Sequence, residues 1–237
     1  MSWGFYEYVP VAKKKRNAEK DLAKLRKKNP DIKPVIINGR KIAVTWWGMA
    51  WNENLEGYAD YANRIGRGRT YVRNGFVLDL QIDSEKVSAI VAGSGSKPYN
   101  VEIEIIALSK TRWKAITELC GRSIANIDQL VQGKFPKDLA ALFTQQGEGL
   151  FPSPKEIKFS CSCPDWAYMC KHVAAVLYGI GARFDDDPGL FFKLRNIEIE
   201  ALIKKSIDEK MENMLKNSGS KTRRVIKNAD LGRLFGI

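Results

Sequence analysis

Three of the four cysteines and the only histidine of this 237-residue chain lie within a dozen residues of one another. They follow the order C-x-C, six residues, C-x-H, and are Cys161, Cys163, Cys170 and His172. Three thiolates and one imidazole form a common closed tetrahedral set for zinc, which leaves no position open for chemistry at the metal. The spacing therefore predicts one structural zinc ion.

The spacing also predicts how the backbone presents these ligands. Residues two apart on a strand project to the same side, so Cys161 and Cys163 can offer both sulfurs from the end of the strand-like stretch IKFSC. Residues two apart on a helix lie about 200° apart around the axis. Cys170 is therefore expected at or just before the first turn of a helix, and the periodic apolar residues after His172 predict that helix.

Other uses of this cysteine cluster fit less well. A thioredoxin-like redox pair needs a C-x-x-C spacing, which neither cysteine pair has. A nucleophilic Cys/His pair needs a free thiol beside a free imidazole, and it would leave two cysteines unexplained.

The rest of the chain predicts an α+β fold: a small antiparallel sheet with packed helices, followed by a strand-knuckle-helix zinc-binding lobe. Helical periodicity predicts one helix from Trp46 to Ile65 and two or three shorter helices within 111–144. From Arg69 the pattern alternates, and Asn74-Gly75 indicates a hairpin turn. The predicted divisions are a basic arm at 1–40, an α+β domain at 41–147, the zinc lobe at 148–197 and a charged tail at 198–237.

The charge balance indicates the kind of partner. A formal charge of +12 favours polyanions through long-range attraction and counterion release, although a basic but inert surface has the same composition. The candidate nucleic-acid contacts are basic residues in one dense cluster and beside the knuckle: Arg64, Arg67, Arg69, Arg73, Lys158 and Lys171. DNA is the expected ligand, with RNA as a further possibility.

Aromatic residues and a methionine between the two ligand pairs are candidates for a protein interface. Trp166, Tyr168 and Met169 are of the types that often anchor interfaces, provided that they are exposed. The alternative is that Trp166 packs over the metal lobe.

The stretch CSCPDWAYMCKHVAAVLY resembles the SWIM zinc-finger family throughout, and the four predicted ligands coincide with its metal ligands. The upstream stretches KIAVTWWGMAWNENLEGYADYANRIGRGRTYVRNGFVLDLQI and YNVEIEI resemble a prokaryotic group of SWIM-domain proteins. The resemblance implies a domain that binds DNA or other proteins. For the prokaryotic group, it also implies association with a Swi/Snf-type helicase-like ATPase.

The sequence offers little for an enzyme. No histidine remains as a general base once His172 binds metal, and GSGSKP fails the Walker A pattern because no Gly-Lys-Ser/Thr is present. A Mg²⁺-dependent nuclease built from strand carboxylates is the remaining alternative; the candidates are Asp79, Asp83, Glu102 and Glu104.

No export signal and no long apolar run is apparent, so we expect a cytoplasmic protein with no membrane association and no small-molecule substrate. We expect a non-enzymatic accessory or adaptor factor associated with nucleic acid; a purely protein-protein adaptor is the alternative.

Overall fold

The computed structural model describes residues 9–57, 62–95, 97–123, 144 and 149–197, with short pieces at 204, 207–208, 211–212 and 214–216. The elements in chain order are α1 (Val11–Lys28), α2 (Trp46–Glu56), α3 (Ala62–Arg73), β1 (Val77–Asp83), β2 (Lys86–Val91), β3 (Tyr99–Ile105), α4 (Lys110–Ser123), a 3₁₀ turn η2 (Pro154–Glu156), β4 (Ile157–Cys161), α7 (Lys171–Asp186) and α8 (Gly189–Leu194).

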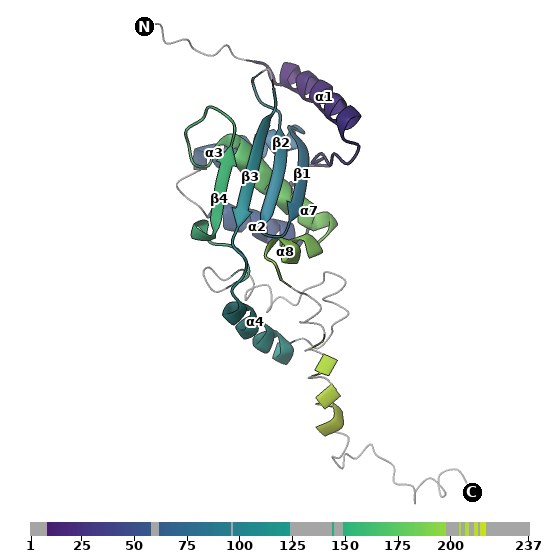
Figure 1. Ribbon diagram of the computed structural model, residues 1–237, viewed down its shortest axis with the longest axis vertical. Coiled ribbons are helices and arrows are strands. Elements are labelled where there is room, and N and C mark those ends of the chain that lie inside the picture. The colour runs from purple at the N-terminus through teal and green to yellow at the C-terminus, as the bar shows by residue number, and fades with distance from the viewer. Residues whose placement is uncertain are drawn as a thin grey trace, which may run out of the picture.

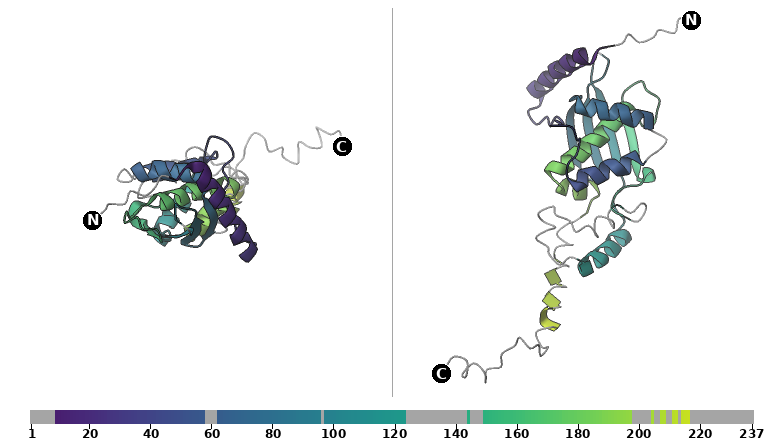
Figure 2. Two further views of the ribbon diagram at one scale, coloured as in Figure 1. Left: turned by 90° about the horizontal axis from the view of Figure 1, so that it is seen from above. Right: turned by 180° about the vertical axis from the view of Figure 1, so that it is seen from behind.

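The strands form one antiparallel sheet in the order β1-β2-β3-β4, and α2, α3 and α7 cover one of its faces (Figures 1 and 2). Strands β2 and β3 alternate between buried and exposed residues, as expected for a sheet with one covered face. This arrangement confirms the predicted α+β class with an antiparallel sheet.

Helix α7 lies at the centre of the core. It contacts the sheet as well as α2 and α3, and almost every residue from His172 to Gly181 is fully buried. It comes close to α3 at Gly68, where an added Cβ would lie 2.4 Å from the Cβ of Ala174. A glycine in α3 therefore lets the two backbones pack together.

The predicted helix from Trp46 to Ile65 is wrong, because two helices occupy this stretch. Helix α2 ends at Glu56, and α3 continues the helical pattern through Arg73, where the prediction placed a strand. Ile65, Gly68 and Val72 are buried at helical spacing, so packing against α7 extends the helix beyond the point where the sequence starts to alternate.

The predicted hairpin turn at Asn74-Gly75 is also wrong. Gly75, with φ 71°, instead ends α3 by bonding its N–H to the carbonyl of Val72. The β1–β2 turn falls at Ser84-Glu85, where Glu85 takes a φ of 61°. Its N–H donates to Leu194 and its carbonyl accepts from Ile105, so tertiary contacts hold a turn that lacks the usual glycine.

The helices predicted at 111–144 do not cover the sheet where the structure describes them. Helix α4 extends away from the sheet (Figure 1), and residues 124–143 lie outside the described part of the chain. Helix α7 packs on the sheet where those helices were expected. Its nearly continuous apolar surface can be buried against the sheet on one side and against α2 and α3 on the other.

The zinc-ligand segment completes the sheet of the preceding residues. Strand β4 pairs with β3, from Val101 opposite Cys161 to Ile105 opposite Ile157, and one hydrophobic core runs across the boundary expected near residue 147. The domain limits remain predictions, but the sheet and core are continuous across that point.

Candidate metal centre and its surroundings

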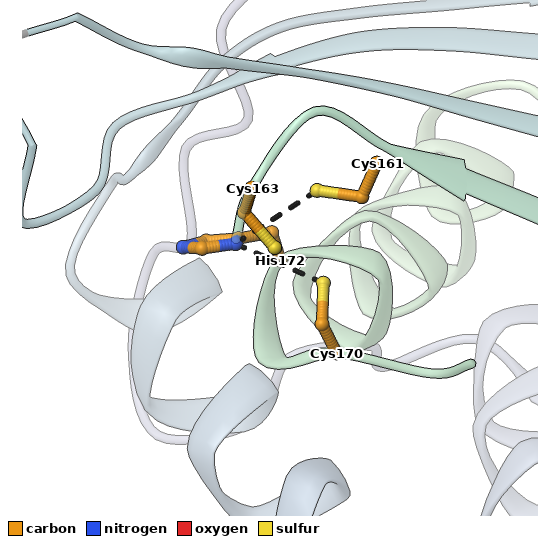
Figure 3. A group of neighbouring side chains, drawn as sticks. All are labelled: Cys161, Cys163, Cys170 and His172. Atoms are coloured by element: carbon orange, nitrogen blue, oxygen red, sulfur yellow. Dashed lines mark hydrogen bonds between the residues drawn. The ribbon is translucent and has the colours of Figure 1, made fainter. Parts of the chain in front are cut away.

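The four predicted ligands converge at one end of the sheet (Figure 3). Cys161 is the last residue of β4, Cys163 follows two residues later, Cys170 is the N-cap of α7 and His172 is its second residue. Both sequence predictions about presentation are therefore confirmed: one pair comes from a strand end, and the other comes from a helix start.

The donor atoms have the separations of a tetrahedral site. All four lie within 4.8 Å of one another, and Nδ1 of His172 is 3.9 Å from Sγ of Cys161 and 3.8 Å from Sγ of Cys170. Zinc bonds of about 2.3 Å to sulfur and about 2.0 Å to nitrogen would place these atoms about 3.6 Å apart. The site needs only a small contraction to bind the ion.

The neighbouring strand fixes the first ligand pair. The N–H of Ser162 donates to the carbonyl of Asn100 at 3.0 Å, and the N–H of Asn100 donates to Oγ of Ser162 at 3.0 Å. These bonds extend the β3–β4 ladder by one residue beyond Cys161. They hold the backbone between Cys161 and Cys163 in place.

Two tyrosines hold the histidine ring. His172 is 1% exposed, and its ring centroid lies 5.4 Å from that of Tyr71 and 4.7 Å from that of Tyr99. With Nδ1 facing the sulfurs, Nε2 is buried and has no hydrogen-bond partner among the described residues. The structure therefore presents Nδ1, rather than Nε2, as the ligand atom.

The thiol group chemistry also favours a bound cation. Hydrogen bonding from Cys161 lowers the pKa of Cys170 to about 3, whereas hydrogen bonding to Cys170, together with burial, raises the pKa of Cys161 above its ordinary value. Burial raises the pKa of Cys163 as well. Without a metal the cluster therefore favours a single thiolate, and a divalent cation would offset the repulsion among three. These four residues are positioned to bind one zinc ion in a closed, structural site.

The knuckle loop between the ligand pairs is fixed on both sides of an exposed tip. Asp165 binds Arg64 of α3 at 2.8 Å, and Tyr168 donates its hydroxyl to the carbonyl of Ile157 at 3.1 Å. Trp166 stands between them and is 94% exposed, so it does not pack over the metal lobe.

Of the three predicted interface residues, Met169 is misplaced. Its side chain is 0% exposed and belongs to the hydrophobic core, whereas Trp166 is at the surface and Tyr168 is 54% exposed. Met169 immediately precedes the N-cap Cys170, and this position places its side chain in the core beneath the loop.

The arginine cluster of the sequence is divided between two flanks of α3. At 100° per residue, Arg64 and Arg67 lie on the flank of Tyr71, beside the zinc ligands, whereas Arg69 and Arg73 lie on the flank of α2. The arginines are separated because this segment is a helix; in a strand, Arg67, Arg69 and Arg73 would all project to the same side.

The α2 flank is internally paired. Nη2 of Arg69 binds the Glu56 carboxylate at 2.5 Å and the Tyr178 hydroxyl at 3.1 Å, and Tyr178 donates to Glu56 at 2.6 Å. Arg73 donates to the carbonyl of Arg40 at 2.9 Å. Burial raises the pKa of Tyr178, and so does its bond to Glu56.

The zinc flank holds cations without such partners. Nζ of Lys171 lies 5.8 Å from the centre of the Tyr71 ring, and Arg67 is exposed one turn before Tyr71. Burial lowers the pKa of Lys14 in α1, and repulsion by nearby Lys171 lowers it further. None of these three cations lies within 4.0 Å of a carboxylate that the structure describes.

The sixth predicted nucleic-acid contact lies elsewhere. Lys158 is exposed on β4, opposite Glu104 of β3, on the face of the sheet that the helices leave uncovered. The structure therefore does not bring it together with the cations of the zinc flank.

Three of the four carboxylates of the nuclease alternative bind separate partners, and the fourth, Glu104, is exposed. Asp79 accepts the N–H of Lys33 at 2.8 Å, Asp83 binds Lys193 at 2.8 Å and Glu102 binds Lys86 at 3.2 Å. Within the described residues, the group suited to a metal ion is the Cys/His set, and these acids do not join one.

Sequence reasoning missed two tyrosines at the site and one ion pair away from it. Tyr71 and Tyr99 were not among the predicted site residues, yet both rings pack against that of His172. Tyr71 follows Arg67 by four residues, one turn of α3, but the alternating pattern there predicted a strand. At the opposite end of β4 from the ligands, an ion pair at 3.0 Å between the buried Arg195 and Glu156 ties the end of α8 to the 3₁₀ turn that precedes β4. No local sequence pattern indicates that pair.

Comparison with known proteins supports the metal site. A family model described as SWIM zinc finger matches residues 149–179. The chain is also 37% identical over 163 residues to a protein of Mycobacterium tuberculosis described as uncharacterized protein Rv2102; this match covers 68% of the chain and 58% of that protein. No solved structure matches the chain significantly. Among the described helices, none is both long and apolar enough to cross a bilayer.

Proposed function

We propose that this protein is a non-enzymatic accessory factor that binds nucleic acid through the zinc end of the molecule. The observation that carries the proposal is the cationic surface formed by Lys14, Arg67 and Lys171, which we call the basic surface. Its three charges come from α1, α3 and α7 and lack carboxylate partners among the described residues.

Bringing cations together without acids costs free energy in the isolated protein, because the two lysines repel each other. A polyanion would remove that cost and would release its own counterions on binding. Arg64 and Arg69 contribute less, since their guanidinium groups already bind Asp165 and Glu56.

The finer parts of the proposal follow from the family resemblance. DNA is the preferred ligand and RNA the second, and the zinc end or the basic arm would attach the protein to a Swi/Snf-type helicase-like ATPase in the cytoplasm. That motor would supply the chemistry, so the proposed role requires no catalytic residue in this chain.

The test compares two exposed arginines of the same helix. Arg67→Ala removes a charge from the basic surface, and Arg73→Ala removes one from the opposite flank. Fluorescence anisotropy on labelled duplex DNA, single-stranded DNA and RNA, each at several salt concentrations, should show weaker binding for the first variant only. The slope of log K against log salt should fall by about 0.7 to 0.9, the value of one phosphate contact.

Equal effects of the two substitutions would mean that net charge alone attracts the polyanion. Binding that disappears by physiological salt in the zinc-loaded wild type would overturn the proposal.

A protein-protein adaptor is the second candidate, and the exposure of Trp166 and Tyr168 favours it. Its test is co-purification of the ATPase with Trp166→Ala while bound zinc is measured. Retention of both zinc and partner would exclude this surface as the contact.

A further inference from the structure

We infer that the protein binds single-stranded nucleic acid, with Trp166 stacking on an unpaired base while the basic surface contacts the adjoining phosphates. This inference rests on the proposed function, and it adds the form of the nucleic acid and the residue that selects it.

The first step is that Trp166 is exposed on a loop with a fixed conformation. Asp165 ties the loop to α3 through Arg64 at 2.8 Å, and the ring of Tyr168 packs 5.1 Å from that of Phe159. The loop begins and ends at zinc ligands, and the buried side chain of Met169 anchors it in the core. An indole that is 94% exposed on such a loop offers an aromatic face without a large ordering cost on binding.

The second step is that the loop adjoins the basic surface. Arg64, which holds Asp165, lies one turn before Arg67 on the same flank of α3. The next turn carries Tyr71, over which Nζ of Lys171 lies, and Lys14 is close to Lys171. Cations therefore follow one another from the foot of the knuckle along α3 to α1.

The third step concerns the ligand that matches both features. Aromatic faces beside a basic track are typical of sites for single strands, because unpaired bases can stack while the phosphates are neutralised. In a duplex the base faces are already stacked on one another and cannot reach an indole. An acidic protein would match the charges, but a protein hot spot also needs surrounding side chains that exclude water from the indole. Trp166 has no such enclosure among the described residues.

The experiment uses the full-length, zinc-loaded protein with Trp166→Ala, Trp166→Phe and Arg67→Ala. The probes are a labelled oligothymidylate of about 16 nucleotides, the upper end of site sizes for one small domain, and a duplex of equal length. Trp166→Ala should weaken single-strand binding by between about fivefold and about a hundredfold, the range for loss of one stacked base. Duplex binding should be unchanged, and Trp166→Phe should recover part of the loss.

Stacking gives a second readout. Unlabelled oligothymidylate should quench tryptophan fluorescence in the wild type, and that quench should be absent in Trp166→Phe. Zinc content should equal that of the wild type in every variant. A fourth variant, Lys14→Ala, should weaken binding of both probes, as Arg67→Ala should. Lys13→Ala is its matched control, because the two lysine side chains leave α1 about 100° apart.

Different results would overturn the single-strand assignment and the nucleic-acid function on which it rests. Unchanged single-strand binding in Trp166→Ala, with Arg67→Ala still weakened on both probes, would overturn the single-strand assignment and leave the nucleic-acid function intact. No binding of either probe by the wild type at physiological salt would overturn the proposed function itself. Loss of zinc in Trp166→Phe would also overturn the stacking role, since the residue would then be part of the fold.

Discussion

The two flanks of α3 carry the same kind of charge and use it differently. On the α2 flank, Arg69 binds a carboxylate and a tyrosine hydroxyl, so its charge is balanced within the protein. On the zinc flank, Arg67 lies near Lys171 and Lys14 and no described carboxylate balances it. Within one sequence cluster, the charges of Arg64 and Arg69 are therefore balanced by carboxylates inside the protein, whereas that of Arg67 is available for binding.

Removal of zinc should have the largest effect on stability, and the loss of structure should begin on the zinc flank. Zinc binding contributes about 10 to 16 kcal/mol in small finger peptides, which is comparable to the whole stability of a domain. Chelation, or Cys163→Ser, should therefore lower the melting temperature strongly and raise hydrogen exchange first in β4 and at the start of α7. Exchange in α2 should rise later.

Adding back zinc should restore the chelated wild type, whereas Mg²⁺ should not. A melting temperature unaffected by complete removal of the metal would contradict the structural role of the ion.

The next largest effect tests the packing of α3 against α7 at Gly68. In Gly68→Ala the new Cβ would meet the Cβ of Ala174 at 2.4 Å and its backbone carbon at 2.7 Å, so α3 and α7 must move. Such overpacking costs about 1 to 3 kcal/mol of unfolding free energy, measurable by denaturant titration.

Gly66→Ala is the matched control, because nothing lies within 4 Å of its added Cβ. It should leave stability unchanged or raise it by up to about 1 kcal/mol through helix propensity. Equal destabilisation by both alanines would show that the close helix contact is not important.

Alkaline pH should lower the unfolding free energy through Tyr178, on the α2 flank. The pKa of Tyr178 is raised chiefly by burial, so above about pH 10 the unfolded chain loses this proton while the folded protein retains it. Stability is then fully present below pH 10 and falls as pH rises, by at most about 1.4 kcal/mol per pH unit from this group. Tyr178→Phe should show a shallower decline between pH 10 and 11 in the same denaturant titration. Identical slopes would mean that the hydroxyl ionises in the folded protein as readily as in the unfolded chain.

The smallest effect compares the two flanks directly. Arg69→Ala should lower the unfolding free energy by about 1 kcal/mol or less, since the Glu56 pair is partly exposed. Arg67→Ala should stay within about 0.5 kcal/mol of the wild type, because it removes no pairing interaction. If the two variants were reversed in denaturant titrations, the distinction between the flanks would be wrong.

The zinc ligands show how much the sequence determines locally. Spacing alone predicted that Cys161 ends a strand and that Cys170 precedes a helix, because side-chain direction in strands and helices has a fixed period. The same reasoning failed at Arg69 to Arg73, where the alternating pattern was weak and packing on α7 decided the conformation. It failed again at Ser84-Glu85, since contacts from Leu194 and Ile105 hold that turn.

The sequence by itself determined the metal, its four ligands and the excess of positive charge, because these depend on residue types and on spacings of a few residues. Only the tertiary structure decided that Met169 is buried while Trp166 is exposed, and that Arg69 is paired while Arg67 has no carboxylate partner among the described residues. Burial and pairing depend on residues more than a hundred positions away, as in the bond between Tyr178 and Glu56, which are 122 positions apart. Local periodicity carries no information about such distant neighbours.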